Sequence, residues 1–344
     1  MKIPSRGAVG NPPNRFERLT IELEEPAERN PRTQFLRESA RSIISRNDSP
    51  DISFSASLNP YRGCEHGCPY CYARPYHEYL GFSSGLDFET RIIVKDNAAE
   101  LLREELASPR WKPEVLAMSA ITDCYQPVEK RLEITRACLR VLAEFRNPVG
   151  IITKNHLVTR DSDILAAMAA DTLCSVHITI TSLDSDLARR LEPRASLPSH
   201  RLDAIAKLAQ AGIPTSVIIA PVILGLNEHE IPGILKAARS AGAVRAAYSV
   251  LRLPHAVKEI FTTWLDEHVP GSSEKILERI RDLRGGALNS SKFGERLRGQ
   301  GFWGEQIQTL FSQSRKREGY ATDHFSYNLT AFRRPPPPQL SLDL

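Results

Sequence analysis

Six short apolar runs, rich in β-branched residues, alternate with helical patterns along most of this chain. They cover residues 52–57, 114–121, 148–154, 173–181, 215–221 and 243–251. Runs of this length and composition are typical of buried strands, and strands separated by helices indicate parallel pairing. Six such units in series predict an α/β fold of the partial (β/α)6 TIM-barrel type, whose active groups lie on the loops after the strands.

The segments between these runs carry helical periodicity. From Val128 to Phe145, apolar residues recur at helical spacing with charged residues between them, including Glu129 and Arg140. This pattern predicts one amphipathic helix that connects two strands. Residues 163–170, 201–212 and 228–242 show similar patterns, and the last two end in Gly212 and Gly242, where a left-handed helix stop is expected.

The composition divides the chain into four regions. Residues 1–50 predict a largely irregular N-terminal arm, 51–262 the barrel, 263–330 a helical C-terminal cap, and 331–344 a proline-rich tail. The 45 Lys and Arg residues against 41 Asp and Glu give a net charge of +4, which neither requires nor excludes a nucleic-acid partner. No run of eighteen apolar residues and no signal-peptide pattern occurs, so we expect no membrane association and a cytoplasmic location.

Half of the six cysteines lie in "NPYRGCEHGCPYCYARPYHEYL", residues 59–80, directly after the first predicted strand. Cys64, Cys68 and Cys71 have the spacing Cys-x3-Cys-x2-Cys, and in a reducing compartment such a group indicates a metal centre or redox chemistry rather than a disulfide. Three cysteines would leave one iron of a four-iron cluster open to another ligand. A structural zinc site with His66 or His77 as fourth ligand, or ordinary buried packing, remains an alternative.

These residues resemble the radical S-adenosylmethionine (radical SAM) enzymes, in the bacterial branch grouped with spore photoproduct lyase. The resemblance covers about residues 50–320 and includes "ITDCYQPVEK", "IITKN", "LEPRAS" and "LRLP" besides the cysteine motif. It implies that the three cysteines hold a [4Fe-4S] cluster whose open iron binds S-adenosylmethionine. Reductive cleavage then releases a 5′-deoxyadenosyl radical, with the electron supplied by a flavodoxin- or ferredoxin-type donor.

The resemblance also implies positions that bind S-adenosylmethionine. Tyr70 corresponds to an adenine contact, with packing beside the cluster as its alternative, and Thr122 and Asp123 end the second strand, where oxygen acceptors suit an ammonium group. A helix N-cap is the alternative for Asp123. Lys154 corresponds to a lysine that meets the cofactor carboxylate or ribose. The remaining candidates of this kind are Thr181 and Arg194, and the charged residues around Glu192 also fit a solvated ion-pair group.

The other three cysteines differ in their setting. Cys138 lies on the apolar stripe of its predicted helix and Cys174 in a predicted strand, so both are expected in the core. Cys124 follows the second strand and is a candidate hydrogen donor. Ala120 stands where the lyase branch carries its hydrogen-donating cysteine, so the resemblance implies radical chemistry but not the lyase reaction itself.

The sequence leaves the substrate open. A damaged or modified nucleic-acid base is one candidate, and Phe293, Phe302 and Trp303 among lysines and arginines could grip a strand, although a solvated helix face has the same composition. The alternative function is a non-catalytic zinc- or iron–sulfur-binding module that recognises nucleic acid or a protein.

Overall fold

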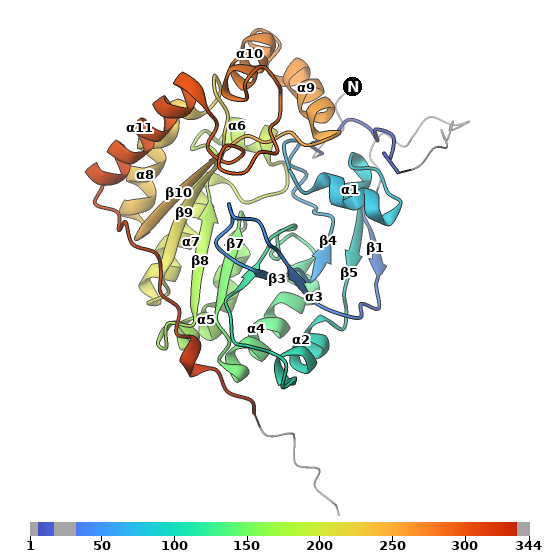
Figure 1. The fold of residues 1–344 in the computed structure, drawn as a ribbon, viewed down its shortest axis with the longest axis vertical. Coiled ribbons are helices and arrows are strands. Elements are labelled where there is room, and N and C mark those ends of the chain that lie inside the picture. The colour runs from blue at the N-terminus through green and yellow to red at the C-terminus, as the bar shows by residue number, and fades with distance from the viewer. Residues whose placement is uncertain (1–5, 17–31, 336–344) are drawn as a thin grey trace, which may run out of the picture.

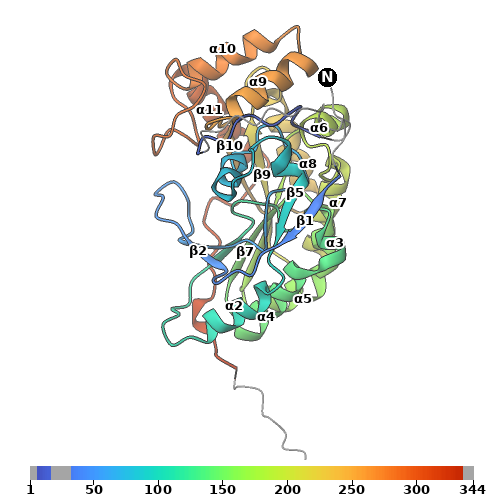
Figure 2. The same ribbon diagram turned by 90° about the vertical axis from the view of Figure 1, so that its right-hand side faces the viewer.

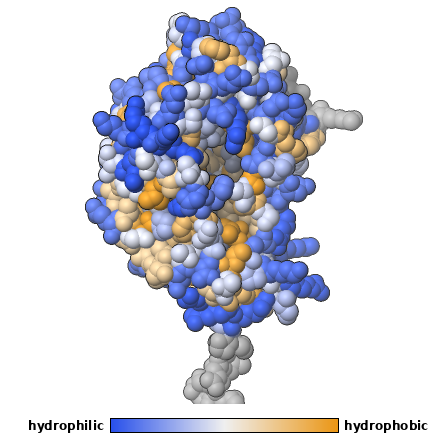
Figure 3. Space-filling model, turned by 60° about the vertical axis from the view of Figure 1, so that its left-hand side comes forward, coloured by the Kyte–Doolittle hydropathy of each residue, from blue (hydrophilic) through white to orange (hydrophobic). Residues whose placement is uncertain are grey.

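The fold is described here for residues 6–16 and 32–335 of the chain, from a computed structural model. A strand forms in or beside each of the six predicted segments, and these strands pair in parallel in one curved sheet (Figure 1). They are β3 (Ala56–Leu58), β6 (Leu116–Met118), β7 (Val149–Thr153), β8 (Cys174–Thr179), β9 (Thr215–Val222) and β10 (Arg245–Val250). The first was expected at residues 52–57 but lies at Ala56–Leu58, because residues 52–55 do not pair as a strand. The order β10-β9-β8-β7-β6-β3-β2, in which β2 is Ile44–Arg46, leaves two free edges, and the surface in Figure 3 is hollowed near its centre. The predicted partial barrel is therefore confirmed.

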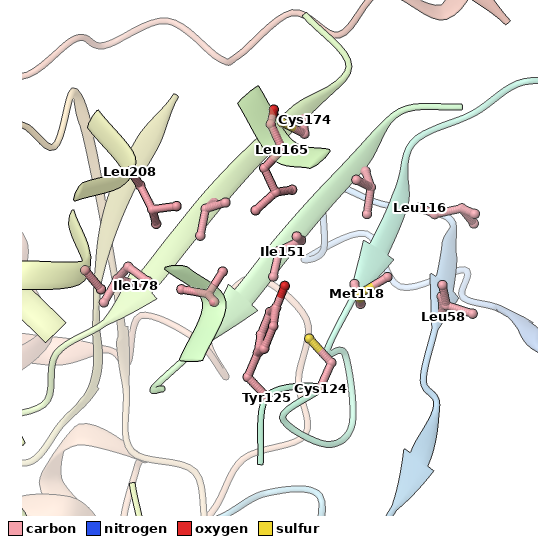
Figure 4. Packing of buried hydrophobic residues seen from close by; sticks show 14 of the residues in the cluster. Leu58, Leu116, Met118, Cys124, Tyr125, Ile151, Leu165, Cys174, Ile178 and Leu208 are labelled. Atoms are coloured by element: carbon pink, nitrogen blue, oxygen red, sulfur yellow. Dashed lines mark hydrogen bonds between the residues drawn. The ribbon is translucent and has the colours of Figure 1, made fainter. Parts of the chain in front are cut away.

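Helices cover the outer side of the sheet (Figures 1 and 2). The connecting helices are α2 (Ala98–Ala107), α3 (Glu129–Leu132), α4 (Ile134–Phe145), α5 (Ser162–Ala169), α6 (Ser185–Leu191), α7 (Pro198–Gln210) and α8 (Ile231–Ser240), with short 3-10 turns η2 (His156–Asp161) and η3 (Glu228–Glu230). Gly212 and Gly242 follow α7 and α8 with φ of +74° and +110°, as the sequence predicts. Side chains of the helices and strands, including Ile151, Leu165 and Ile178, interlock in the main core (Figure 4).

The helix expected from Val128 to Phe145 is interrupted, which corrects the sequence prediction. Glu133 separates α3 from α4 with a left-handed φ of 53°. The carboxylate of Glu129 is fully buried rather than on a solvated face, and it accepts the backbone N–H of Thr135 at 3.0 Å. An acidic group at this helix start satisfies an N–H that has no partner within the helix, so the break is stabilised by a residue that precedes it.

Two short strands lie in the N-terminal region. β2 (Ile44–Arg46) pairs antiparallel with β3, whereas β1 (Gln34–Arg37) joins β5 (Arg91–Val94) and β4 (Tyr61–Arg62) in a separate sheet with the order β1-β5-β4. This small sheet, α1 (Leu86–Thr90) and η1 (Arg74–Leu80) surround the segment that carries the three cysteines.

The C-terminal region is helical, with α9 (Val257–His268), α10 (Ser273–Leu283), α11 (Gly301–Arg317) and the turn η4 (Leu329–Ala331). Residues 336–344 of the proline-rich tail lie outside the described residues. In the described part of the chain, none of the helices combines the length and the apolar character needed to cross a membrane.

After α11 the chain runs back along the lower edge of the main sheet (Figure 1). The backbone N–H groups of Ala321, Asn328 and Arg333 donate to the carbonyls of Val244, Thr172 and Phe145, at 2.9 to 3.1 Å. The three acceptors each stand shortly before β10, β8 or β7. We call residues 320–333 the C-terminal strap, because they connect the amino ends of these strands.

Candidate functional site

The three cysteines lie on one tightly folded loop between β4 and η1. Cys64 and Cys68 are buried, Cys71 is half-buried, and all three are free thiols. Gly63 and Gly67 adopt left-handed φ values of 77° and 70°. A Cβ atom on Gly67 would lie 2.8 Å from a carboxylate oxygen of Glu89, so a side chain at this position would have to push the loop outward. The glycines therefore allow the loop to fold tightly.

A buried ion pair between Arg74 and Glu89 holds the cysteine loop. Arg74 is fully buried, pairs with Glu89 and donates from Nε to the Cys68 carbonyl at 2.8 Å. Glu89 also accepts the backbone N–H groups of Gly7 and Ala8 at 3.1 and 2.9 Å. The N-terminal residues 6–16 thus lie against the loop and help to hold its shape.

Burial favours the protonated form of all three thiols, because it raises their pKa values. Burial raises the pKa of Cys68 to about 12, with Glu192 adding to the rise and Lys154 opposing it. Burial, Asp123 and the neighbouring thiols raise the pKa of Cys64 well above its ordinary value. Because metals bind the thiolate, loading this site would displace these protons.

Asp123 connects three loops at the carboxyl ends of the strands. Its two carboxylate oxygens accept Thr153 Oγ1 at 2.7 Å and the Lys154 backbone N–H at 2.8 Å, and His66 Nδ1 lies 3.5 Å away. It is not the N-cap of α3, where Val128 stands. The adjacent Thr122 donates its hydroxyl to the Gly63 carbonyl at 2.8 Å. Both predicted residues therefore lie against the cysteine loop, with these polar atoms already engaged by the protein.

Lys154 differs from its neighbours because its ammonium group forms no hydrogen bond or ion pair with any residue in the described ranges 6–16 and 32–335. It lies close enough to the loop to lower the pKa of Cys68 and of Cys71. An unpaired cation beside the loop suits an anionic partner.

Tyr70 and Thr181 meet in a buried hydrogen-bond network. Both hydroxyls donate to one carboxylate oxygen of Glu192, which is 2% exposed, and Arg201 forms an ion pair with the other oxygen. Glu192 is therefore not part of a solvated surface group. Burial opposes its charge, but Arg201 and Lys154 lower its pKa below the ordinary value. The network fixes Tyr70 and the backbone between Cys68 and Cys71.

Arg194 binds the loop from a second direction. Its guanidinium pairs with Glu65 at 2.9 Å, and its backbone N–H donates to the His66 carbonyl at 3.3 Å. Glu65 in turn accepts the Val128 backbone N–H at 2.7 Å. Arg194 thus helps to hold the cysteine loop in place in this structure.

Residues 58–238 match the sequence model of the Radical SAM superfamily. The chain belongs to this superfamily. The matched region contains the cysteine loop and all strands of the main sheet from β6 to β9. The resemblance stated from the sequence is therefore confirmed.

Several proteins and solved structures are similar to the chain. An uncharacterized protein of Mycobacterium tuberculosis (strain ATCC 25618 / H37Rv) is 32% identical, over 84% of this chain and 79% of its own. A radical SAM Nalpha-GlyT isomerase of Pseudomonas phage M6 is 27% identical, over 53% of this chain and 36% of its own. The structure of spore photoproduct lyase complexed with dinucleoside spore photoproduct matches 83% of this chain and 80% of its own, with a TM-score of 0.59 and 15% identity. This last similarity shows a common fold.

The two histidines considered as a fourth zinc ligand make other contacts in this structure. Within the described residues, no three His, Cys, Asp or Glu side chains are gathered to hold one metal ion. His66 is buried between Asp123 and Asn155, and His77 packs against Phe82 and Phe88. A cluster needs one thiolate on each of three irons, spread more widely than the ligands of one zinc ion.

The remaining cysteines lie in the core. Cys138 and Cys174 are completely buried, as predicted. Cys124 is also completely buried, with its sulfur among the side chains of the main core near Tyr125 and Met118 (Figure 4). In this structure the Cys124 thiol therefore does not face the surface, and its role as a hydrogen donor remains a prediction.

Several residues that build the site were not found from the sequence. They are Arg74, Glu89, Gln126, Asn155 and Arg201, and each contacts the loop or its immediate support. Gln126 lies in the quoted "ITDCYQPVEK", but glutamine has no spacing rule that would single it out.

Proposed function

We propose that this protein is a radical SAM enzyme in which Cys64, Cys68 and Cys71 hold a [4Fe-4S] cluster and S-adenosylmethionine binds beside it. The observation that carries the proposal is the folded loop of three free thiols within a region that matches the Radical SAM superfamily. When bound and reduced, the cluster supplies the electron that cleaves a sulfonium C–S bond and so starts radical chemistry on a substrate hydrogen.

The chain itself supplies position and charge. Arg74 and Arg194 hold the loop through the Cys68 carbonyl and Glu65. The unpaired ammonium of Lys154 offers a cation to the carboxylate of S-adenosylmethionine, and the carboxylate of Asp123 offers an acceptor to its amino group. Tyr70 and Thr181 keep the other side of the loop rigid through Glu192. We place the protein in the cytoplasm, with a flavodoxin- or ferredoxin-type protein as electron donor.

For the substrate we propose a base of nucleic acid. Exposed aromatic rings with arginine side chains over them lie beside the cysteine loop and support this choice. We propose that three further residues shape the cofactor pocket without touching the cofactor through a free polar group, because their polar groups are already bonded to Glu65 or Glu192. They are Arg194, Thr181 and Tyr70.

The proposal predicts a sharp difference between two buried cysteines. Cys68→Ala removes a proposed cluster ligand, whereas Cys138→Ala removes a sulfur from the core of α4. After anaerobic reconstitution and chemical reduction, we expect wild type and Cys138→Ala to contain about four irons per chain and to release 5′-deoxyadenosine from S-adenosylmethionine. Cys68→Ala should lose the iron and release none. Iron, acid-labile sulfide and product are measured on the same samples.

Two outcomes would contradict the proposal. Full cluster content in Cys68→Ala would remove this residue from the ligand set. Wild-type protein that binds one zinc ion at stoichiometric amount, and takes up no iron on reconstitution, would favour the alternative of a non-catalytic zinc module.

A further inference from the structure

The outer surface of η1, which begins shortly after Cys71, exposes a row of aromatic rings. Tyr76 and Tyr79 are 50% and 65% exposed, and Phe16 of the N-terminal segment is 55% exposed. The ring centroids of Phe16 and Tyr79 lie 4.9 Å apart, and those of Tyr79 and Tyr76 lie 6.4 Å apart. Tyr72, next to Cys71, is 44% exposed. Four large rings thus remain open to solvent beside the cysteine loop.

Arginine side chains lie over these rings. The guanidinium of Arg15 is 4.6 Å from the Phe16 centroid and 5.5 Å from that of Tyr79, and Arg252 is 5.5 Å from the ring of Tyr72. We call the rings of Phe16, Tyr72, Tyr76 and Tyr79 with Arg15 and Arg252 the aromatic–arginine surface. Alternating rings and guanidinium groups are the means by which proteins bind unpaired nucleotides.

Arg252 at this surface and Lys95 in the adjoining cavity form no ion pair within the described residues. Arg15 pairs with Glu78, but Arg252 forms no hydrogen bond or ion pair within the described part of the chain, and its Nε is buried. Lys95, which is 5% exposed, forms no side-chain hydrogen bond or ion pair with a described residue either. Burial lowers the pKa of Lys95 and of Arg252. The carboxylates that oppose this effect are more distant, Glu38 and Glu105 for Lys95 and Asp51 for Arg252. A poorly solvated cation without a close anionic partner is stabilised by a ligand that supplies one.

Lys95 lies in a cavity of about 240 Å³ that also has Tyr76 and Tyr79 in its wall. Arg62 lines the same cavity and pairs with Glu38 at 3.1 Å, while the nearby Glu105 accepts the Ile43 backbone N–H. Gly63 and Ala73, which flank the cysteine segment, form another part of the wall. The cavity therefore joins the exposed tyrosines to the back of the cysteine loop.

We propose that the aromatic–arginine surface binds single-stranded nucleic acid, with bases stacked on Tyr76 and Tyr79 and phosphate groups at Lys95 and Arg252. A duplex hides the faces of its bases, so stacking on these exposed rings requires unpaired nucleotides. The inference deepens the proposed function, on which it rests for the identity of the neighbouring site, because it names the substrate class as a strand with unpaired bases.

The test measures binding of fluorescein-labelled 20-nucleotide oligo(dT) and oligo(U) to the reconstituted protein by fluorescence anisotropy. Tyr79→Ala and Tyr76→Ala should each weaken binding about tenfold, whereas Tyr79→Phe keeps the ring and should bind like wild type. Phe302→Ala in α11 tests the C-terminal aromatic residues that the sequence offered as the other strand-binding group, and Phe302 is as exposed as Tyr79, at 65%. Its affinity should be unchanged. The two oligonucleotides distinguish DNA from RNA.

The cations are tested by the salt dependence of binding. Lys95→Gln and Arg252→Gln should each reduce the slope of log affinity against log salt by about 0.7, as expected for the loss of one phosphate contact to a single strand. An unchanged slope in both variants would overturn the placement of the phosphates.

Three results would overturn the inference itself. The first is that Tyr79→Ala binds the oligonucleotides as tightly as wild type. The second is that wild type binds a 20-base-pair duplex as tightly as the single strands, or more tightly. The third is that it binds a labelled polyglutamate peptide equally well, which would indicate a protein partner. Failure of the proposed function gives a different result: a protein that binds the strand through Tyr79 but releases no 5′-deoxyadenosine keeps this surface and lacks the chemistry. A protein that releases 5′-deoxyadenosine but binds neither oligonucleotide has the radical chemistry and lacks the strand-binding surface.

Discussion

Single residues far apart in the sequence determine the shape of the cysteine loop. The cysteines themselves could be predicted, because their spacing is local. The role of Glu192 could not be predicted. It accepts a hydrogen bond from Tyr70, which is 122 positions away in the sequence, and nothing in "RRLEPR" shows which of its charged residues is buried. Arg201 gave no signal either, since an arginine in an amphipathic helix usually faces solvent. The residues that hold the loop are therefore visible only once the fold brings them together.

The buried pair of Glu192 and Arg201 leads to a prediction about stability. Arg201→Met leaves the Glu192 carboxylate buried without its cation and should lower the free energy of unfolding by about 3–5 kcal/mol. Arg189→Ala removes an arginine from a pair with Asp186 in which both side chains are more than half exposed, and should cost less than about 1 kcal/mol. Urea unfolding of both variants measures the difference. Equal losses would mean that Glu192 is not charged in the fold.

The elements of the main sheet followed from the sequence, and the smaller ones did not. Most of the six strands were predictable because they are runs of buried, mainly apolar residues, such as Val149 to Thr153. Strand β10 is largely half-buried and was found from its small and β-branched residues. Strand β1 has the burial pattern of an exposed segment and pairs only through its backbone, so its side chains carry no periodic signal. The break at Glu133 was missed because apolar spacing continues through it.

The same break predicts a stabilising substitution. Glu133 is exposed and has a left-handed φ of 53°, which costs an L-residue about 1 kcal/mol and glycine almost nothing. Glu133→Gly should therefore raise the free energy of unfolding by up to about 1 kcal/mol. Arg140→Gly, at an exposed position inside α4, should lower it by about the same amount. Thermal or urea unfolding compares them, and a loss of stability in Glu133→Gly would show that its side chain is needed.

At the scale of the whole molecule, an N-terminal and a C-terminal segment lie against opposite ends of the barrel. Residues 6–16 lie against the cysteine loop at the carboxyl ends of the strands, and the C-terminal strap connects their amino ends. The strap reaches into the sheet through Tyr327, whose hydroxyl is hydrogen-bonded to Ser175 on β8. Ser175 in turn lies 3.0 Å from His177 Nε2.

His177 makes this contact sensitive to pH. Burial, together with Arg245, lowers the pKa of His177 to about 4, below the ordinary value of 6.5. The unfolded chain therefore binds a proton at higher pH than the folded one, and stability is complete above about pH 6.5 and declines as the pH falls towards 4. Between pH 7.5 and 4.5 wild type should lose about 2–3 kcal/mol more than His177→Gln. Urea unfolding at both pH values measures this, and parallel pH profiles would contradict it.

The strap also sets an order of events during synthesis. Every strand of the main sheet has been translated before Tyr320, the first residue of the strap, is added to the nascent chain. Until then the carbonyls of Val244, Thr172 and Phe145 lack their final partners, and Gly150, against which the Tyr327 hydroxyl packs, stays uncovered. Folding that proceeds from the N-terminus can therefore assemble the cysteine loop first and seal the opposite end of the barrel last.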